Sequence, residues 1–190
     1  MIRWLERAGV VIASLVIAVA IIVLLSGGLA GTQDDPGVTG GQRGPGIAYR
    51  DLGDLHLRPG QARPHYDSDP PTSGPHNPVN VTRDGATISD DQLLQALQVG
   101  DIVLMYGTHK PPPGLEALAA RSAPRFTPAL AATGGAVILA RRPGTRGIIA
   151  LAWTHMQPAA TASDPRLPEF INYWLGRGAP VSGSPALPKS

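Results

Sequence analysis

Hydrophobic and polar positions divide the chain into an apolar N-terminal run and a mixed remainder. Residues 8–25 carry no charge, and their one polar side chain is Ser14. An α-helix of this length extends about 27 Å, close to the hydrocarbon thickness of a bilayer. Apolar side chains surround that helix instead of following one face, as lipid contact requires. The pattern predicts a transmembrane helix over 8–25.

The charges beside this run predict its orientation. Arg3 and Arg7 precede it, whereas Asp34 and Asp35 are the first charges after it. Because cytoplasmic flanks carry an excess of Lys and Arg, residues 1–7 are expected in the cytoplasm. The chain is then a single-pass protein of the cell membrane with its C-terminal part outside. A cleaved signal peptide is the alternative, since residues 28–30 (Gly-Leu-Ala) are small; it leaves the remainder equally extracytoplasmic.

Composition separates the rest into three parts. Residues 26–46 are rich in glycine and are expected to form a flexible linker. Residues 181–190 are mostly Ser, Pro and Gly and are expected to form a disordered tail. Residues 47–180 have the length of one ordinary domain. This segment is the expected extracytoplasmic domain, and we expect the functional residues to lie in it.

Periodicity within 47–180 predicts alternating helices and strands. Ser89 to Gln92 is a capping box, followed by an apolar stripe that ends at Gly100. At the other end, Asp164 precedes a helix with apolar residues at i, i+3, i+4 and i+7, ending near Gly176. The other predicted elements are a helix over 113–122 and strands over 102–106, 136–140 and 148–153, the last two joined as a hairpin through 142–145. This order favours an α+β fold, a small, mainly antiparallel sheet with helices on one face.

Composition and charge exclude several classes of function. The 190 residues contain no cysteine, which excludes a disulfide framework, a thiolate zinc site, a cysteine nucleophile and an iron–sulfur cluster. The formal net charge is only +2, so no basic patch is expected and nucleic acid is not an expected partner.

The loop before the first domain helix carries an unusual motif. It reads Pro-Pro-Thr-Ser-Gly-Pro-His over 70–76, with Tyr66 four residues before it, His56 further upstream and an Ala-Trp pair at 152–153. This pattern resembles the domain of unknown function 3105 family of bacterial membrane-anchored proteins. The resemblance implies an envelope location and a late helix, and it implies no activity, because the family has none established.

One segment departs from the family pattern. Where the family has a Leu-Val-His-Ser-Leu-Glu-His-Gly segment, this chain has Gln95, Gln98 and Val99 in place of the two histidines and the glutamate. Glutamine is no general base near neutral pH and a poor ligand for transition metals, and valine can do neither. A metal or catalytic centre built on those positions is therefore reduced here.

The loop supports two hypotheses of different class. The first is a non-enzymatic module that binds an envelope protein or a ligand through Tyr66, Thr72, Ser73 and His76. The alternative is a metal-binding or metal-dependent protein that holds copper or zinc at His56 and His76, without the usual His-x-x-x-His spacing. Ser73 and His76 are also compatible with a hydrolase, but the sequence has no nucleophile-elbow motif. No catalytic residue and no organic cofactor are expected, and an enzyme is the less favoured class.

Overall fold

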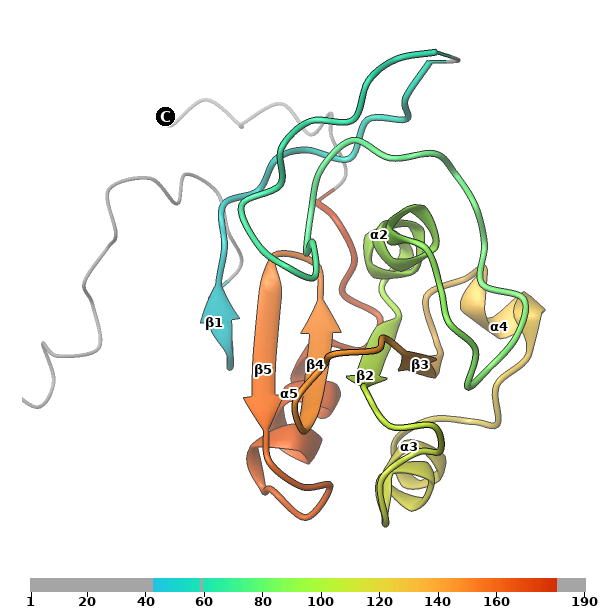
Figure 1. The fold of residues 1–190 in the computed structure, drawn as a ribbon, viewed down its shortest axis with the longest axis vertical. Coiled ribbons are helices and arrows are strands. Elements are labelled where there is room, and N and C mark those ends of the chain that lie inside the picture. Colours follow the sequence, from blue (N-terminus) through green and yellow to red (C-terminus); the bar gives the residue numbers. More distant parts are fainter. Residues whose placement is uncertain (1–42, 59, 181–190) are drawn as a thin grey trace, which may run out of the picture. The chain divides into compact units, whose positions relative to one another are not determined.

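The computed structural model describes residues 43–58 and 60–180, and it has the predicted α+β architecture (Figure 1). Its sheet has five strands in the order β1-β5-β4-β2-β3. Neighbouring strands are antiparallel except for β2 and β3, which run parallel. The mainly antiparallel sheet is confirmed. The strands are β1 (Ile47–Ala48), β2 (Ile102–Tyr106), β3 (Val137–Arg141), β4 (Ile148–Ala152) and β5 (His155–Ala159).

Four helices within the described residues accompany the sheet, and the expectation that the helices share one face is wrong. Ile102, Leu104 and Tyr106 of β2 pack with the apolar residues of α3 (Leu115–Ser122) and α5 (Arg166–Trp174). Val103 and Met105, which point the other way in a pleated strand, pack with those of α2 (Asp90–Val99). A fourth, short helix is α4 (Pro128–Ala131). The sheet is therefore covered on both faces. This agrees with β2, in which all five residues are buried although successive side chains point to opposite faces.

The predicted hairpin between the third and fourth strands is also wrong. β3 does not pair with β4, because β2 lies between them and pairs with both. β4 instead forms a hairpin with β5 through the residue pair Trp153–Thr154. Thr154 adopts φ 61°, a left-handed conformation that is uncommon for a β-branched residue. The tight turn thus places a strained residue at the end of the sheet.

The helix ends follow the local sequence with small shifts. The capping box before α2 is confirmed: the Ser89 hydroxyl accepts from Gln92 N, and the Gln92 side chain accepts from Ser89 N. α3 begins at Leu115, two residues later than expected, because Gly114 has φ 83°. Asp164 lies one residue before the N-cap of α5, where its carboxylate binds Arg166.

The start of the described chain packs against α5. The Tyr173 hydroxyl donates to Arg43 O, and Trp174 Nε1 donates to Pro45 O at 2.8 Å. Residues 43–46, which were assigned to the linker, therefore belong to the domain. None of the helices within 43–58 and 60–180 is long and apolar enough to cross a bilayer. The expected span over 8–25, the rest of the linker and the tail over 181–190 lie outside the described residues.

A candidate binding site around His56 and His76

The long loop between β1 and α2 is fastened over the end of the sheet where β4 turns into β5 (Figure 1). Thr154 N donates to Thr72 O at 2.9 Å, so the strained turn holds the middle of the motif. The Ser73 hydroxyl donates to Arg50 O and accepts from Leu52 N. The Tyr66 hydroxyl donates to Pro75 O. These polar groups hold the loop in one conformation.

This packing decides which predicted binding residues can reach a partner. Thr72 and Ser73 are fully buried. Since both hydroxyls are engaged inside the loop, the two residues position the site and offer no contact surface. Tyr66 is half-buried, and burial raises the pKa of its hydroxyl, with Arg63 acting in the opposite direction. Among the described residues, the hydrogen bonds of Ser73 include none to a histidine, so they assemble no catalytic triad.

His56 and His76 lie side by side on two short extended segments. Leu57 N donates to His76 O at 2.9 Å, and His76 N donates to Leu55 O at 3.2 Å, which forms a parallel bridge. The two ring centroids are 5.6 Å apart and the rings are nearly perpendicular. His56 is exposed, whereas His76 is fully buried. The predicted histidine pair is therefore brought together.

The buried ring of His76 has one occupied and one unoccupied nitrogen. Nδ1 lies 2.9 Å from Gly74 O, and a carbonyl oxygen can only accept, so Nδ1 carries the proton. In the neutral ring Nε2 then presents a lone pair, and it has no hydrogen-bond partner among the described residues. Trp153, whose ring centroid is 6.5 Å from that of His76, also has an unpaired Nε1. Buried polar atoms without partners are uncommon, and these two nitrogens are left unpaired by the side chains around them.

The polar stripe of α2 runs along the same histidine pair, whereas the sequence indicated Gln95 and Gln98 only as departures from the family pattern. Asp91 accepts from the backbone N and the side chain of Asn77, next to His76. Gln98 donates to Asp54 O, two residues before His56. Gln95 lies between them on the same helical face, and its Oε1 is buried without a partner. The i, i+4, i+7 spacing of these three polar residues was the available signal.

Asp91 fixes the charge at one end of this stripe. Burial alone would raise the pKa of its carboxyl group. The hydrogen bonds from Asn77 and the guanidinium of Arg63 outweigh burial and lower the pKa below its usual value. Asp91 therefore remains an anion that holds the loop to α2 and is already fully engaged.

The other three histidines lie elsewhere. His155 is buried on the α5 side, with its ring centroid 4.0 Å from that of Trp174. Burial lowers the pKa of its ring. His65 and His109 are exposed in loops. Within the described part of the chain, no three His, Asp or Glu side chains are grouped as a metal ion would need.

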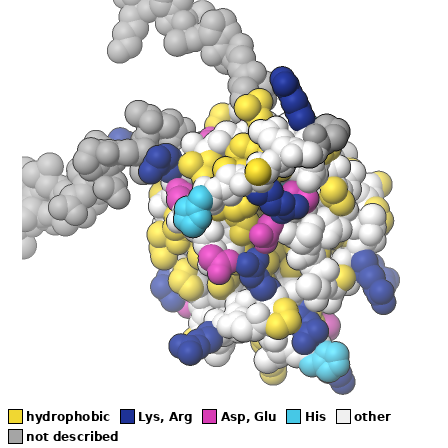
Figure 2. Space-filling model, turned by 45° about the horizontal axis from the view of Figure 1, so that its top comes forward, with side chains coloured by type: hydrophobic (Ala, Val, Ile, Leu, Met, Phe, Trp, Pro, Cys, Tyr) yellow, Lys and Arg dark blue, Asp and Glu magenta, His cyan; other side chains and the backbone are white. Residues whose placement is uncertain are grey.

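A hollow of about 630 Å³ lies beside the exposed histidine. Its apolar walls include Leu55, which is 72% exposed, together with Leu57 and Pro75. Its polar groups are His56, Arg58 and Gln61, and no carboxylate of a described residue lines it. On the face shown in Figure 2, basic side chains are spread out with acidic ones between them. The hollow is thus a local, mildly cationic feature on a surface of mixed charge.

Comparison with known proteins supports the family resemblance. A family model described as "Protein of unknown function (DUF3105)" matches residues 59–185, about two thirds of the chain. The match includes the 70–76 motif, α2 and the later strands and helix, and it begins three residues after His56. Neither the curated proteins nor the solved structures gave a match. On the family match, this chain belongs to the DUF3105 family of proteins of unknown function.

Proposed function

We propose that this chain is a membrane-anchored module that holds its domain outside the cytoplasm and binds a ligand beside His56 and His76. The support for the location is the uncharged run over 8–25 with Arg3 and Arg7 before it. The observation that carries the binding site is the hollow of about 630 Å³ beside His56, whose lining combines the exposed Leu55 with His56 and Arg58. The module is not an enzyme in this proposal.

The chemistry of the hollow favours an anionic ligand with an apolar part. Arg58 has no ion pair with another described residue, and no lining residue has a compensating carboxylate. Leu55 presents an apolar side chain that water surrounds in the free protein. A partner segment that combines an acidic residue with a leucine-like side chain would satisfy both features. Such a segment could belong to another envelope protein.

A second candidate function is metal binding by the two imidazoles. One observation favours it: His76 donates its Nδ1 proton to a backbone carbonyl, the arrangement that orients most metal-ligating histidines. Copper or zinc suits imidazole nitrogens. Gln95 and Gln98 occupy the facing helix and supply no strong ligand, so the metal would keep open coordination positions.

One labelled sample of the full chain in detergent micelles tests both candidates. We expect acetyl-Glu-Leu-Glu-Leu to shift the amide signals of 55–61 in a saturable way. Arg58→Gln should weaken this binding about threefold, the value of an ion pair near the surface. Arg121→Gln, an exposed arginine on α3, is the matched control and should change nothing.

The contradicting outcomes differ for the two candidates. Equal binding of acetyl-Lys-Leu-Lys-Leu, or no effect of Arg58→Gln, contradicts the anionic ligand. For the metal candidate, zinc chloride or copper(II) chloride should bind with one equivalent, and His76→Ala should abolish binding while His109→Ala keeps it. No binding by the unaltered chain, or equal binding by both variants, removes the metal candidate.

A further inference from the structure

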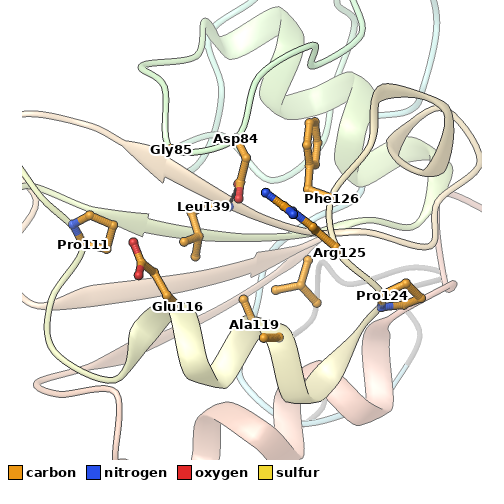
Figure 3. Close-up of a pocket in the computed structure, with 11 residues that line it drawn as sticks. Asp84, Gly85, Pro111, Glu116, Ala119, Pro124, Arg125, Phe126 and Leu139 are labelled. Carbon is orange, nitrogen blue, oxygen red and sulfur yellow. Dashed lines mark hydrogen bonds between the residues drawn. The ribbon is translucent and has the colours of Figure 1, made fainter.

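A second hollow lies on the opposite side of the domain core from α2, between α3 and the outer edge of the sheet (Figure 3). Its volume is about 570 Å³, within the range of small-molecule sites. Its floor is apolar: Val137 and Leu139 of β3, with Ala119 of α3. Phe126 and two prolines complete the apolar wall. It shares no lining residue with the hollow at His56.

Three charged side chains converge on this floor. In Figure 3, Asp84 points toward Leu139, the guanidinium end of Arg125 points toward Asp84 from the other side, and the carboxylate of Glu116 rises from α3 between Leu139 and Pro111. The side chains of Glu116 and Arg125 form no hydrogen bond or ion pair with another residue of the described chain. Asp84 uses only Oδ1, which accepts from Leu139 N at 2.8 Å. Charges of both signs are therefore available to one ligand.

The wall that carries Asp84 is fixed and not a loose flap. Gly85 N donates to Leu139 O, and Arg141 N donates to Ala86 O, both at 2.9 Å. Thr87 and Arg141 form a parallel bridge, so the segment adds to the edge of β3 like a short strand. A preformed site loses little entropy when a ligand binds.

The two carboxylates also act on a neighbouring phenol. Tyr106 ends β2, and its hydroxyl lies 3.9 Å from the position that a Cβ on Gly85 would take. Burial raises the pKa of Tyr106, the charges of Asp84 and Glu116 raise it further, and the guanidinium of Arg141 acts in the opposite direction. The phenol therefore stays a neutral donor beside the acidic side of the hollow.

We infer that this hollow binds a small zwitterion with an apolar side chain, namely an apolar α-amino acid or a short peptide of such residues. Its ammonium group would face Asp84 and Glu116, its carboxylate would pair with Arg125, and its side chain would lie on Ala119 and Leu139. Ammonium–carboxylate and guanidinium–carboxylate pairs are the strong, charge-assisted hydrogen bonds that such a ligand needs. A ligand lacking either charge would leave one side of the hollow unpaired.

The test uses the full chain in detergent micelles, with L-leucine, leucinamide and 4-methylpentanoate as probes. Leucine should shift the amide signals of Ala119, Phe126 and Leu139 in a saturable way, without shifting those of 55–61. Leucinamide lacks the carboxylate and 4-methylpentanoate lacks the amine, so each should bind about fivefold more weakly or worse. The dipeptide Leu-Leu distinguishes a peptide from a free amino acid.

Two exposed variants assign the charges. Glu116→Gln should weaken the binding of leucine and of leucinamide but not that of 4-methylpentanoate. Arg125→Gln should weaken the binding of leucine and of 4-methylpentanoate but not that of leucinamide. Glu169→Gln, an exposed acid on α5, is the control and should weaken none. The inference is overturned if neither leucine nor Leu-Leu saturates these signals, or if binding is indifferent to Glu116 and Arg125. Because 55–61 is read separately, this result is independent of the proposed function.

Discussion

Gly134→Ala is expected to destabilise the domain by about 3 kcal/mol or more. Gly134 has φ 78°, and a Cβ placed there would lie 1.8 Å from Val99 O, the last residue of α2. The backbone of two elements would have to separate, because neither atom belongs to a flexible side chain. Urea unfolding of the chain from Arg43 onward, followed by tryptophan fluorescence, measures the loss.

Gly144→Ala provides the matched control. Gly144 also has a left-handed conformation, with φ 93°, but nothing lies within 4 Å of its added Cβ. Only the backbone strain remains, so the free energy of unfolding should fall by about 1 kcal/mol. Equal losses at the two positions would mean that the contact between Gly134 and α2 is not close.

Asp101→Asn is expected to remove most of a pH dependence of stability. Asp101 immediately precedes β2 and is only 1% exposed. Its Oδ1 accepts from Ala136 N at 2.8 Å, and its Oδ2 has no partner among the described residues. Burial raises its pKa from 3.8 to about 7, against the lowering effect of the Ala136 hydrogen bond. The folded state therefore favours the neutral carboxyl group.

Whether stability rises or falls with pH depends on the number of protons bound in the folded and in the unfolded state. Between pH 4 and pH 7 the folded chain keeps a proton at Asp101 that the unfolded chain has released. The contribution of Asp101 is thus fully present below pH 4, is lost as pH rises to about 7, and is constant above. The loss reaches up to about 4 kcal/mol, at about 1.4 kcal/mol per pKa unit. Asparagine is neutral throughout, so the variant should be the more stable protein at pH 8.

The difference between the two proteins isolates this contribution. Other groups, such as His155, titrate in both and cancel. Urea unfolding at several pH values from 4 to 8 gives the difference directly. Asp101→Ala, which also leaves Ala136 N unpaired, should be less stable than Asp101→Asn by about 1–3 kcal/mol. A difference between wild type and Asp101→Asn that is constant with pH would contradict the raised pKa.

Most helices and strands were predicted correctly because capping residues and apolar periodicity, which depend on nearby residues, determine them. The α2 capping box and the apolar stripe of α5 depend on residues within two turns of each other. β5 was missed because His155, Gln157 and Pro158 interrupt its apolar pattern. Pro158 is tolerated because β1 pairs only with the first two residues of β5, which leaves Pro158 with one strand neighbour.

Strand order and the covering of both faces could not be predicted because they are non-local. The Pro-Gly turn after β3 is consistent with a hairpin, yet β2 takes the place beside β4. At the site, the pairing of His56 with His76 was predicted from the motif. The roles of Thr72 and Ser73 depend on hydrogen bonds to Thr154 and Arg50, which are distant in the sequence. The spacing of Asp91, Gln95 and Gln98 is visible in the sequence, but their contacts with the loop are seen only in the fold.

The most direct test of the account is the protonation of the His76 ring, measured by ¹⁵N NMR of the imidazole nitrogens in the full chain. We expect the neutral form of the ring to carry its proton on Nδ1 and to leave Nε2 unprotonated, because Nδ1 donates to Gly74 O. His76→Ala identifies the signals. A proton on Nε2 in the neutral ring would contradict this arrangement, since Nδ1 would then not donate to Gly74 O and Nε2 would offer no lone pair to a metal ion.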